Sequence, residues 1–269
     1  MPHADVGGLA LHYQQQGEGP DLLMIMGLGT DLYAWDQVLP HIEGFRVTRF
    51  DNRGAGLSDK PEGDYSMRDF VADTLGLMDA LGIERAHLAG ISMGGMIAQH
   101  LAIAHPERVE RLALMVTSAG GPAFVPPAPW VLGAMTNPPT DPTPEALAER
   151  HGPVLFSERF RRERPEEVVR VFTRSLERPM PMRCFQSQLA AIMRHDATGG
   201  LGGLRMPTLV VSASDDALVP PANSEHLLRA LPGAGHHRVE GSGHAITHEA
   251  PRELAEVLMR FLEGAPASA

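Results

Sequence analysis

The sequence predicts an α/β fold: a mostly parallel, doubly wound sheet that is interrupted by an inserted helical segment. Three observations carry this prediction. Short apolar runs alternate with stretches of helical spacing through residue 116, and again from residue 207 onward. Between these two regions the chain is rich in proline and glycine and then in helix-like segments. A Gly-x-Ser-x-Gly pentad also stands between an apolar run and a helix-like run, as expected at a strand-to-helix junction.

The composition favours one large globular domain. The chain has 269 residues, of which 43% are hydrophobic and 21% charged, enough to build a substantial core and too apolar for disorder. The 23 basic and 33 acidic residues leave a net charge of −10. No stripe of Lys and Arg with interleaved aromatic residues is present, so we expect no nucleic-acid partner.

Several classes of site and location are disfavoured by what the sequence lacks. Cys184 is the single cysteine, and no His-Glu-x-x-His pattern is present, so we expect neither a disulfide nor a metal or other cofactor. The N-terminus has no basic and apolar leader, and no apolar stretch approaches the ~20 residues that span a bilayer. These features predict a soluble cytoplasmic protein without a membrane contact, and they do not indicate an oligomeric state.

The first region contains five expected strands and two expected helices. Leu9 begins an edge strand, whereas the continuous apolar run that begins at Leu22 is typical of a strand buried on both faces. A helix with apolar spacing ends before Gly82, and the helix after the pentad ends at Pro106. The strands are expected at residues 9–13, 22–26, 45–50, 87–89 and 111–116, and the first helix at 69–81.

The middle of the chain reads as a helical cap. Residues 120–144 are rich in proline and glycine. Thr143-Pro144-Glu145 is typical of a helix start, Pro165 begins a second helix, and a third is expected at about 181–195. We therefore divide the chain into a core at 1–119 and 200–269 and a cap at 120–199. The core resumes with strands at 207–212 and 236–240 and a helix at 252–262, and a frayed tail is expected at 266–269.

The pentad Gly90-Ile91-Ser92-Met93-Gly94 is the strongest candidate for chemistry. In a tight strand-to-helix turn the residues two before and two after the serine must be small, and the strained serine projects its hydroxyl into a cleft. A serine nucleophile needs a base, and the base needs an orienting acid. In a doubly wound sheet such groups lie in loops at the carboxyl ends of strands. Two such loops carry Asp215-Asp216 and Gly241-Ser242-Gly243-His244, which gives the order Ser, Asp, His.

These pieces resemble the α/β-hydrolase family over nearly the whole chain. The matching motifs are the pentad, the segment 51–58 (Asp-Asn-Arg-Gly-Ala-Gly-Leu-Ser), the segment 216–220 (Asp-Ala-Leu-Val-Pro) and the loop that ends at His244. The resemblance implies the α/β-hydrolase fold and a triad of Ser92, Asp216 and His244. It places the acid four residues before Pro220, which leaves Asp215 as a loop-capping carboxylate. Some relatives carry the acid after the preceding strand, where this chain has Thr117-Ser118-Ala119.

The oxyanion hole of such an enzyme uses two backbone N–H donors. One is expected from Met93, the residue after the nucleophile. The other is expected from the loop after the early strand, and by position we assign it to Leu28. Many relatives have His-Gly in this loop, whereas this chain has Met26-Gly27; the departure keeps the donor, because it is a main-chain amide.

The substrate is less defined than the chemistry. The segments 27–35 and 45–58 are similar to those of bacterial enol-lactonases, so a carboxylesterase for small or apolar esters and a lactone hydrolase are both open, with the ester hydrolase preferred. Carbon–carbon bond hydrolases and perhydrolases share the triad, and a non-catalytic ligand-binding protein on this fold is a further alternative. Apolar residues that would line the pocket, or simply pack the cap, include Trp35, Trp130 and Met135. A dianionic lactone would need cations, and the cap offers Arg174, Arg178, Arg183 and Arg194.

Overall fold

The sheet is mostly parallel, with an antiparallel edge at the N-terminal end. The computed structural model describes residues 1–137 and 139–264, so the expected tail at 266–269 lies outside the described residues. The strand order is β1-β2-β4-β3-β5-β6-β7-β8. Strands β1 to β2 and β2 to β4 pair antiparallel, and all later neighbours pair parallel. The strands are β1 His3–Asp5, β2 Ala10–Gln16, β3 Asp21–Ile25, β4 Arg46–Phe50, β5 Ala86–Ile91, β6 Val109–Met115, β7 Thr208–Ala213 and β8 Gly235–Val239.

Alternate residues of the central strands feed two separate apolar layers. In β3, Leu23 and Ile25 pack on one side of the sheet, while Leu22 and Met24 pack on the other. This is the two-residue period of a strand that is buried on both faces, which explains why the run is apolar without interruption.

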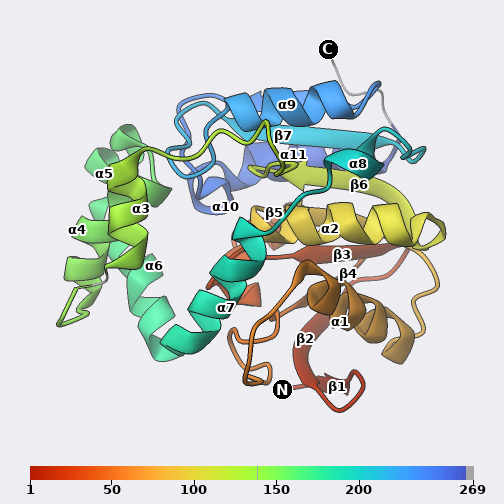
Figure 1. Ribbon diagram of the computed structural model, residues 1–269, viewed down its shortest axis with the longest axis horizontal. Helices are drawn as coiled ribbons and strands as arrows, with labels where there is room; N and C mark the ends of the chain where they lie inside the picture. Colours follow the sequence, from red (N-terminus) through yellow and green to blue (C-terminus); the bar gives the residue numbers. More distant parts are fainter. Residues whose placement is uncertain (138, 265–269) are drawn as a thin grey trace.

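Helices cover both faces of this sheet (Figure 1). Helices α1 (Met67–Ala80), α2 (Met93–Ala104) and α9 (Ala222–Ala230) contribute to one apolar layer. Helix α11 (Pro251–Leu262), together with the short turns η1 (Leu32–Trp35) and η2 (Leu39–His41), covers the opposite face. The arrangement is the doubly wound α/β architecture that the sequence predicts.

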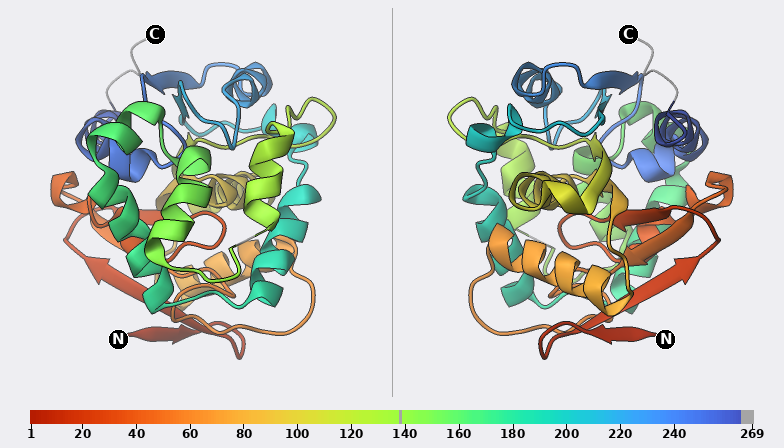
Figure 2. Two further views of the ribbon diagram at one scale, coloured as in Figure 1. Left: turned by 90° about the vertical axis from the view of Figure 1, so that its left-hand side faces the viewer. Right: turned by 90° about the vertical axis from the view of Figure 1, so that its right-hand side faces the viewer.

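A group of helices stands apart from these layers, at the carboxyl end of the parallel strands (Figures 1 and 2). The predicted helix starts are confirmed: Thr143 accepts a hydrogen bond from the Ala146 amide, and Pro144 and Pro165 occupy first turns. The members are α3 Pro129–Thr136, α4 Pro144–Leu155, α5 Glu158–Glu163, α6 Pro165–Glu177 and α7 Met182–Met193, and the short α8 Thr198–Leu201 follows. We call α3 to α7 the cap.

The chain enters and leaves the cap through two segments that lie side by side. Gly120 forms an isolated antiparallel bridge with Asp196, and the Ala197 amide donates to Ala119 O at 2.9 Å. The position of this bridge fits the proposed division of the chain near residues 119 and 200.

Several details differ from the sequence predictions. Helices α3 and α8 were not predicted, and three further differences have local causes. The strand expected at the edge is covered by β1, whose three residues are too few to carry a pattern. The first helix begins at Met67, because Ser66 and Asp69 form a reciprocal capping box. Helix α9 was not predicted, since four of its nine residues are apolar and Leu227 is the one among them that is buried.

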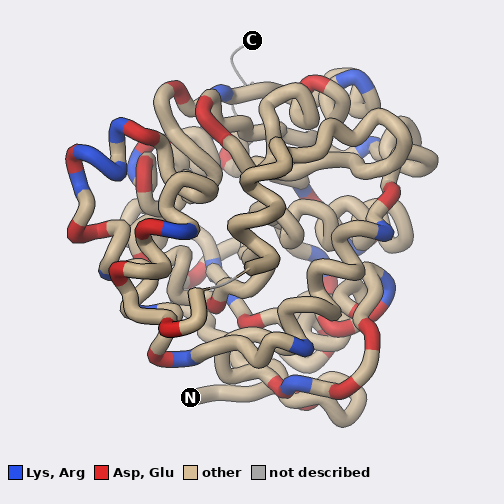
Figure 3. The backbone as a smooth tube through the Cα atoms, turned by 60° about the vertical axis from the view of Figure 1, so that its left-hand side comes forward, with Lys and Arg blue, Asp and Glu red and all other residues tan. Residues whose placement is uncertain are grey.

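The surface carries interspersed charges. In the view of Figure 3 acidic and basic residues alternate along the cap helices and along the core. Within the described ranges, no helix is both long and apolar enough to cross a membrane.

Candidate active site

Ser92 occupies the tight turn between β5 and α2. Its backbone has φ 54° and ψ −119°, a conformation that costs a non-glycine residue about 1–3 kcal/mol. A Cβ at Gly90 would overlap Gly94 O, and a Cβ at Gly94 would overlap Ile25 O. The small residues that the pentad supplies are therefore required by the turn, as the sequence predicts.

The neighbouring strand holds this strained turn in place. The Ser92 amide donates to Met115 O at 2.9 Å, and the Thr117 hydroxyl donates to Ser92 O at 2.8 Å. Val116, which precedes Thr117, has φ 42°, unusual for a β-branched residue. Two strained residues, Ser92 and Val116, thus lie on adjacent strand ends, and the two residues that flank Val116 are hydrogen-bonded to Ser92. Sequence reasoning noted Thr117 only for its lack of a carboxylate and missed this role.

Asp216 and His244 form a buried acid–base pair. His244 Nδ1 lies 2.8 Å from Asp216 Oδ2, and the two side chains are 9% and 1% exposed. Asp216 Oδ1 accepts from the amides of Leu218 and Val219 at 2.9 and 2.8 Å. The carboxylate is therefore fixed by its own loop, and it holds Nδ1 so that the other ring nitrogen is free to act as a base.

The neighbouring candidates have other partners. Asp215 is exposed and accepts from the Ser214 hydroxyl, which agrees with a loop-capping carboxylate. His236 bonds Ser212 Oγ at 2.8 Å, and His237 bonds Glu253 at 2.8 Å. His248 is half-buried, and desolvation lowers its pKa to about 4. His244 is thus the histidine that the structure pairs with Asp216.

The nucleophile and the base are not bonded to each other. Across the described residues, no hydrogen bond joins Ser92 Oγ to His244 Nε2. Both groups follow parallel strands of the same sheet and so lie at its carboxyl edge. Such bonds are often long in the absence of substrate and tighten when it binds.

The candidate oxyanion loop lies directly against the nucleophile. A Cβ built at Gly27 would stand 3.1 Å from Ser92 Cβ and 3.5 Å from Ser92 Oγ. Across the described residues, the amides of Leu28 and Met93 donate no hydrogen bond to protein groups. Two unengaged amides next to a serine hydroxyl are the arrangement that an oxyanion hole requires.

Polar side chains from the core fix the two ends of this loop. Asn52 Nδ2 donates to Met26 O at 2.9 Å, and Asp51 Oδ1 accepts from the Leu32 amide at 2.7 Å. Asp51 also bonds His12 Nδ1 at 2.8 Å, in a pair whose side chains are fully buried. The segment 51–58 therefore shapes the turn beside the site.

Glu249 links the loop of the candidate base to the cap. Its Oε1 accepts from the amides of Gly243 and Ser157, both at 2.9 Å, and its Oε2 accepts from the Ser157 hydroxyl at 2.5 Å. On the other side of His244, the Ala245 amide donates to Leu155 O at 2.8 Å. The residues that flank His244 are thus held by α10 (Ile246–Glu249) and by the segment around Ser157.

We expect Glu249→Leu to lower both stability and activity. The change removes three accepted hydrogen bonds and leaves the Gly243 and Ser157 amides unpaired, at a cost of about 2–4 kcal/mol. Glu249→Gln keeps a carbonyl acceptor for both amides and is the matched control, expected within about 1 kcal/mol of the parent. Urea unfolding and ester turnover of the three proteins measure these effects. Equal losses in both variants would contradict the proposed role of the Glu249 hydrogen bonds.

The stability difference between the parent protein and Glu249→Gln should depend on pH. Burial raises the pKa of Glu249 above its ordinary value. A raised folded-state pKa contributes stability that is complete below the unfolded value of about 4.3 and is lost as pH rises through the folded value. The Gln variant lacks this titration, so its free energy of unfolding should rise relative to that of the parent between pH 4 and neutrality.

The three proposed pocket residues lie in different environments. Trp35 is fully buried in the apolar layer under the sheet, so the structure supports the packing alternative for this residue. Trp130 is 54% exposed on α3. Met135 packs on the cap cluster that also contacts Ala217 and Leu218, next to Asp216. Met135 is therefore the one of the three that packs on a cluster adjoining the loop of Asp216.

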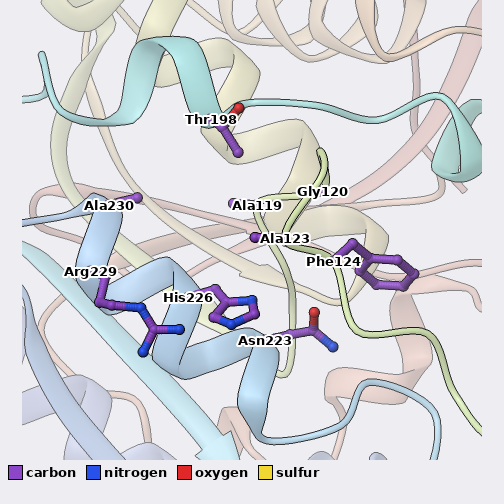
Figure 4. Close-up of a pocket in the computed structure, with 9 residues that line it drawn as sticks. All are labelled: Ala119, Gly120, Ala123, Phe124, Thr198, Asn223, His226, Arg229 and Ala230. Atoms are coloured by element: carbon purple, nitrogen blue, oxygen red, sulfur yellow. The ribbon is translucent and has the colours of Figure 1, made fainter.

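A separate hollow of about 330 Å³ lies beside the bridge between cap and core (Figure 4). None of its lining residues belongs to the candidate triad. The lining is mostly apolar and comes from the segment after β6, from α8 and from α9: Ala119, Gly120, Ala123, Phe124, Thr198, Asn223, His226, Arg229 and Ala230.

Comparisons with known proteins identify the family of the chain. A family model described as alpha/beta hydrolase fold matches residues 20–251. The enol-lactonase of Burkholderia xenovorans LB400 superimposes with a TM-score of 0.85 at 31% identity, covering 97% of this chain and 100% of that one. A 2-hydroxy-6-oxononadienedioate/2-hydroxy-6-oxononatrienedioate hydrolase of Paraburkholderia phymatum is 31% identical over 94% of this chain and 91% of its own. A poly(3-hydroxyalkanoate) depolymerase of Ectopseudomonas oleovorans is 30% identical over 90% and 84%.

Proposed function

Because this chain belongs to the α/β-hydrolase fold family, and is therefore a hydrolase by family, we propose that it is a serine hydrolase that cleaves carboxylic esters of small or apolar substrates. The observation that carries the proposal is the buried pair of Asp216 and His244 at the same sheet edge as the strained Ser92. A nucleophile, a base and an acid that orients the base are the side-chain groups that acyl transfer requires.

The steps follow from the roles of these groups. His244 Nε2 takes the proton of Ser92 Oγ while the oxygen attacks the carbonyl carbon of the ester. The amides of Leu28 and Met93 stabilise the oxyanion of the tetrahedral intermediate. His244 then gives the proton to the leaving alcohol, and an acyl group remains on Ser92. Water, deprotonated by His244, releases the acid and restores the serine.

The charges of the cap favour an uncharged substrate. Four arginines could receive a dianionic lactone, but each has a partner elsewhere. Arg178 Nε bonds Asp31 at 2.9 Å, and Arg174 lies 3.5 Å from Asp36. Arg183 donates to the sulfur of the buried Cys184, and Arg194 donates to Tyr65 O. A dicarboxylate would have to share each guanidinium group with its present partner or displace that partner, which makes these arginines less favourable cation sites than unpaired ones.

Apolar side chains face the catalytic loops instead. The cluster of Val131, Ala134 and Val154 contacts the residues that follow Asp216, and the cluster of Phe156, Val168 and Phe172 contacts Ala245. An apolar acyl or alcohol group gains from burial against such surfaces, by about 0.8 kcal/mol per methylene.

A panel of substrates tests the proposal. We expect kcat/KM for para-nitrophenyl butyrate to exceed that for a carboxylate-bearing enol-lactone by at least ~100-fold, with neutral γ-lactones in between. The factor corresponds to about 2.7 kcal/mol, which one unpaired charge in the site readily costs. Ser92→Ala supplies the background rate. Preferred turnover of the carboxylate-bearing lactone would contradict the ester assignment and favour the second candidate.

That second candidate is a lactone hydrolase, and the likeness to the enol-lactonase favours it. It shares the same triad and oxyanion hole, so the panel separates it by substrate and not by mechanism. Binding of esters without turnover would instead indicate a non-catalytic member of the fold.

A further inference from the structure

Gln188 is a polar residue in an otherwise apolar stripe of the cap. Helix α7 turns Cys184, Gln188 and Ala191 toward the core at helical spacing, and Gln188 is fully buried. A buried amide costs free energy unless both of its ends have partners. The partners of Gln188 therefore indicate why this position is polar.

Both ends of the Gln188 amide bond to main-chain groups next to the candidate site. Oε1 accepts from the Gly29 amide at 3.0 Å, and Nε2 donates to Arg53 O at 2.8 Å. Because an amide N–H must face an acceptor and a carbonyl must face a donor, the orientation of the side chain is fixed. The ring of Phe185, one turn earlier on α7, lies beside Gly29.

We propose that Gln188 is a positioning residue for the oxyanion hole, an inference that rests on the proposed serine hydrolase function. Gly29 directly follows Leu28, whose amide is the proposed donor. Asn52 holds Met26 O on the other side of that donor. The Leu28 amide is thus centred between two anchors, one from the core and one from the cap.

The consequence is that the cap takes part in transition-state stabilisation and does more than cover the site. Even a small ester that touches no cap residue depends on the docking of α7. A misplacement of about 1 Å at a reacting group can cost ~10²-fold in rate, which sets the scale of the effect.

Gln188→Met tests the proposal, since it keeps the length of the side chain and removes both bonds. Two quantities are measured: kcat and KM for para-nitrophenyl butyrate, and the inhibition constant of a short alkyl trifluoromethyl ketone. Ser92 Oγ adds to the ketone carbon, its proton passes to His244, and the resulting oxyanion fills the hole. We expect kcat to fall 10- to 100-fold with KM within about 3-fold, and the inhibition constant to rise by a similar factor.

Ser187→Ala is the matched control. The Ser187 hydroxyl, on the same helix, donates to Gly63 O at 2.9 Å, far from the oxyanion loop in the chain. Its loss should change either quantity by less than about 3-fold. Equal losses in both variants, or a folded Gln188→Met protein with both quantities within 2-fold of the parent, would overturn the proposal.

Gln188→Glu decides the question if the Met variant does not fold. The carboxylate still accepts from Gly29 N, but its second oxygen faces Arg53 O without a proton. We expect a partial loss of kcat, with a ratio to the parent that recovers at lower pH, where a protonated carboxyl donates to Arg53 O; a ratio independent of pH contradicts the proposal. A parent protein without ester turnover would refute the proposed function, whereas an active parent with unaffected Gln188 variants would refute only this inference.

Discussion

Replacing Ser92 by alanine is expected to lower kcat for para-nitrophenyl butyrate by about 10⁴- to 10⁶-fold. The change removes the atom that we propose carries the acyl group, while the turn itself is preserved, because Thr117 and the Met115 carbonyl hold its backbone. Stability should not fall, because within the described residues the Ser92 side chain makes no hydrogen bond that alanine would lose. Initial rates and thermal unfolding of the purified variant measure both quantities.

Ser118→Ala provides the control for this experiment. Ser118 is a buried serine at the carboxyl end of the neighbouring strand, and within the described residues its hydroxyl has no hydrogen-bond partner. Its removal should leave kcat within about 3-fold of the parent. Retained turnover in Ser92→Ala, or an equal loss in Ser118→Ala, would mean that another group is the nucleophile.

Asp216→Asn should have the second largest effect, about 10⁴-fold in kcat. The asparagine carbonyl would still accept from the amides of Leu218 and Val219, so its NH₂ group would face His244 Nδ1. Nδ1 must then be the acceptor, and the ring proton moves to Nε2. A histidine with Nε2 protonated cannot take the serine proton, although the fold is intact.

Asp215→Asn is the comparison, since it changes the adjacent carboxylate in the same loop. Asp215 is exposed, and its Oδ1 accepts only from the Ser214 hydroxyl within the described residues. Turnover should stay within about 3-fold of the parent. If Asp215→Asn were the more damaging of the two variants, the assignment of the acid would be reversed.

The sheet and the cap were largely predictable because their signals are local. A run such as 22–26 is apolar without a break since both faces of the sheet are buried, and Pro144 and Pro165 mark first turns directly. The short edge strand β1 and the mostly polar helix α9 gave no such signal, because pairing with β2 and packing on the sheet determine them.

The candidate triad could be predicted for a similar reason. Ser92, Asp216 and His244 each follow a strand, so the topology alone brings them to one edge. The family resemblance already selected Asp216 over Asp215, and in the structure Asp215 is exposed whereas Asp216 is bonded to His244.

The supporting residues were beyond sequence reasoning. Thr117, Glu249 and Gln188 act through main-chain atoms of residues 6 to 159 positions away, and no spacing rule relates such partners. One signal was present: Gln188 interrupts the apolar stripe of its helix between Cys184 and Ala191. A polar residue at such a position indicates a buried partner, but only the structure identifies the Gly29 amide.

Covalent labelling by an alkyl fluorophosphonate tests the central claim most directly. Ser92 Oγ would displace fluoride from phosphorus, with His244 accepting the proton, and leave a stable phosphonyl ester. Mass spectrometry of the intact and digested protein should find one adduct per chain, on Ser92, formed in proportion to the loss of ester turnover. Complete inhibition with Ser92 unmodified, or an unlabelled protein that still hydrolyses esters, would show that this serine is not the nucleophile.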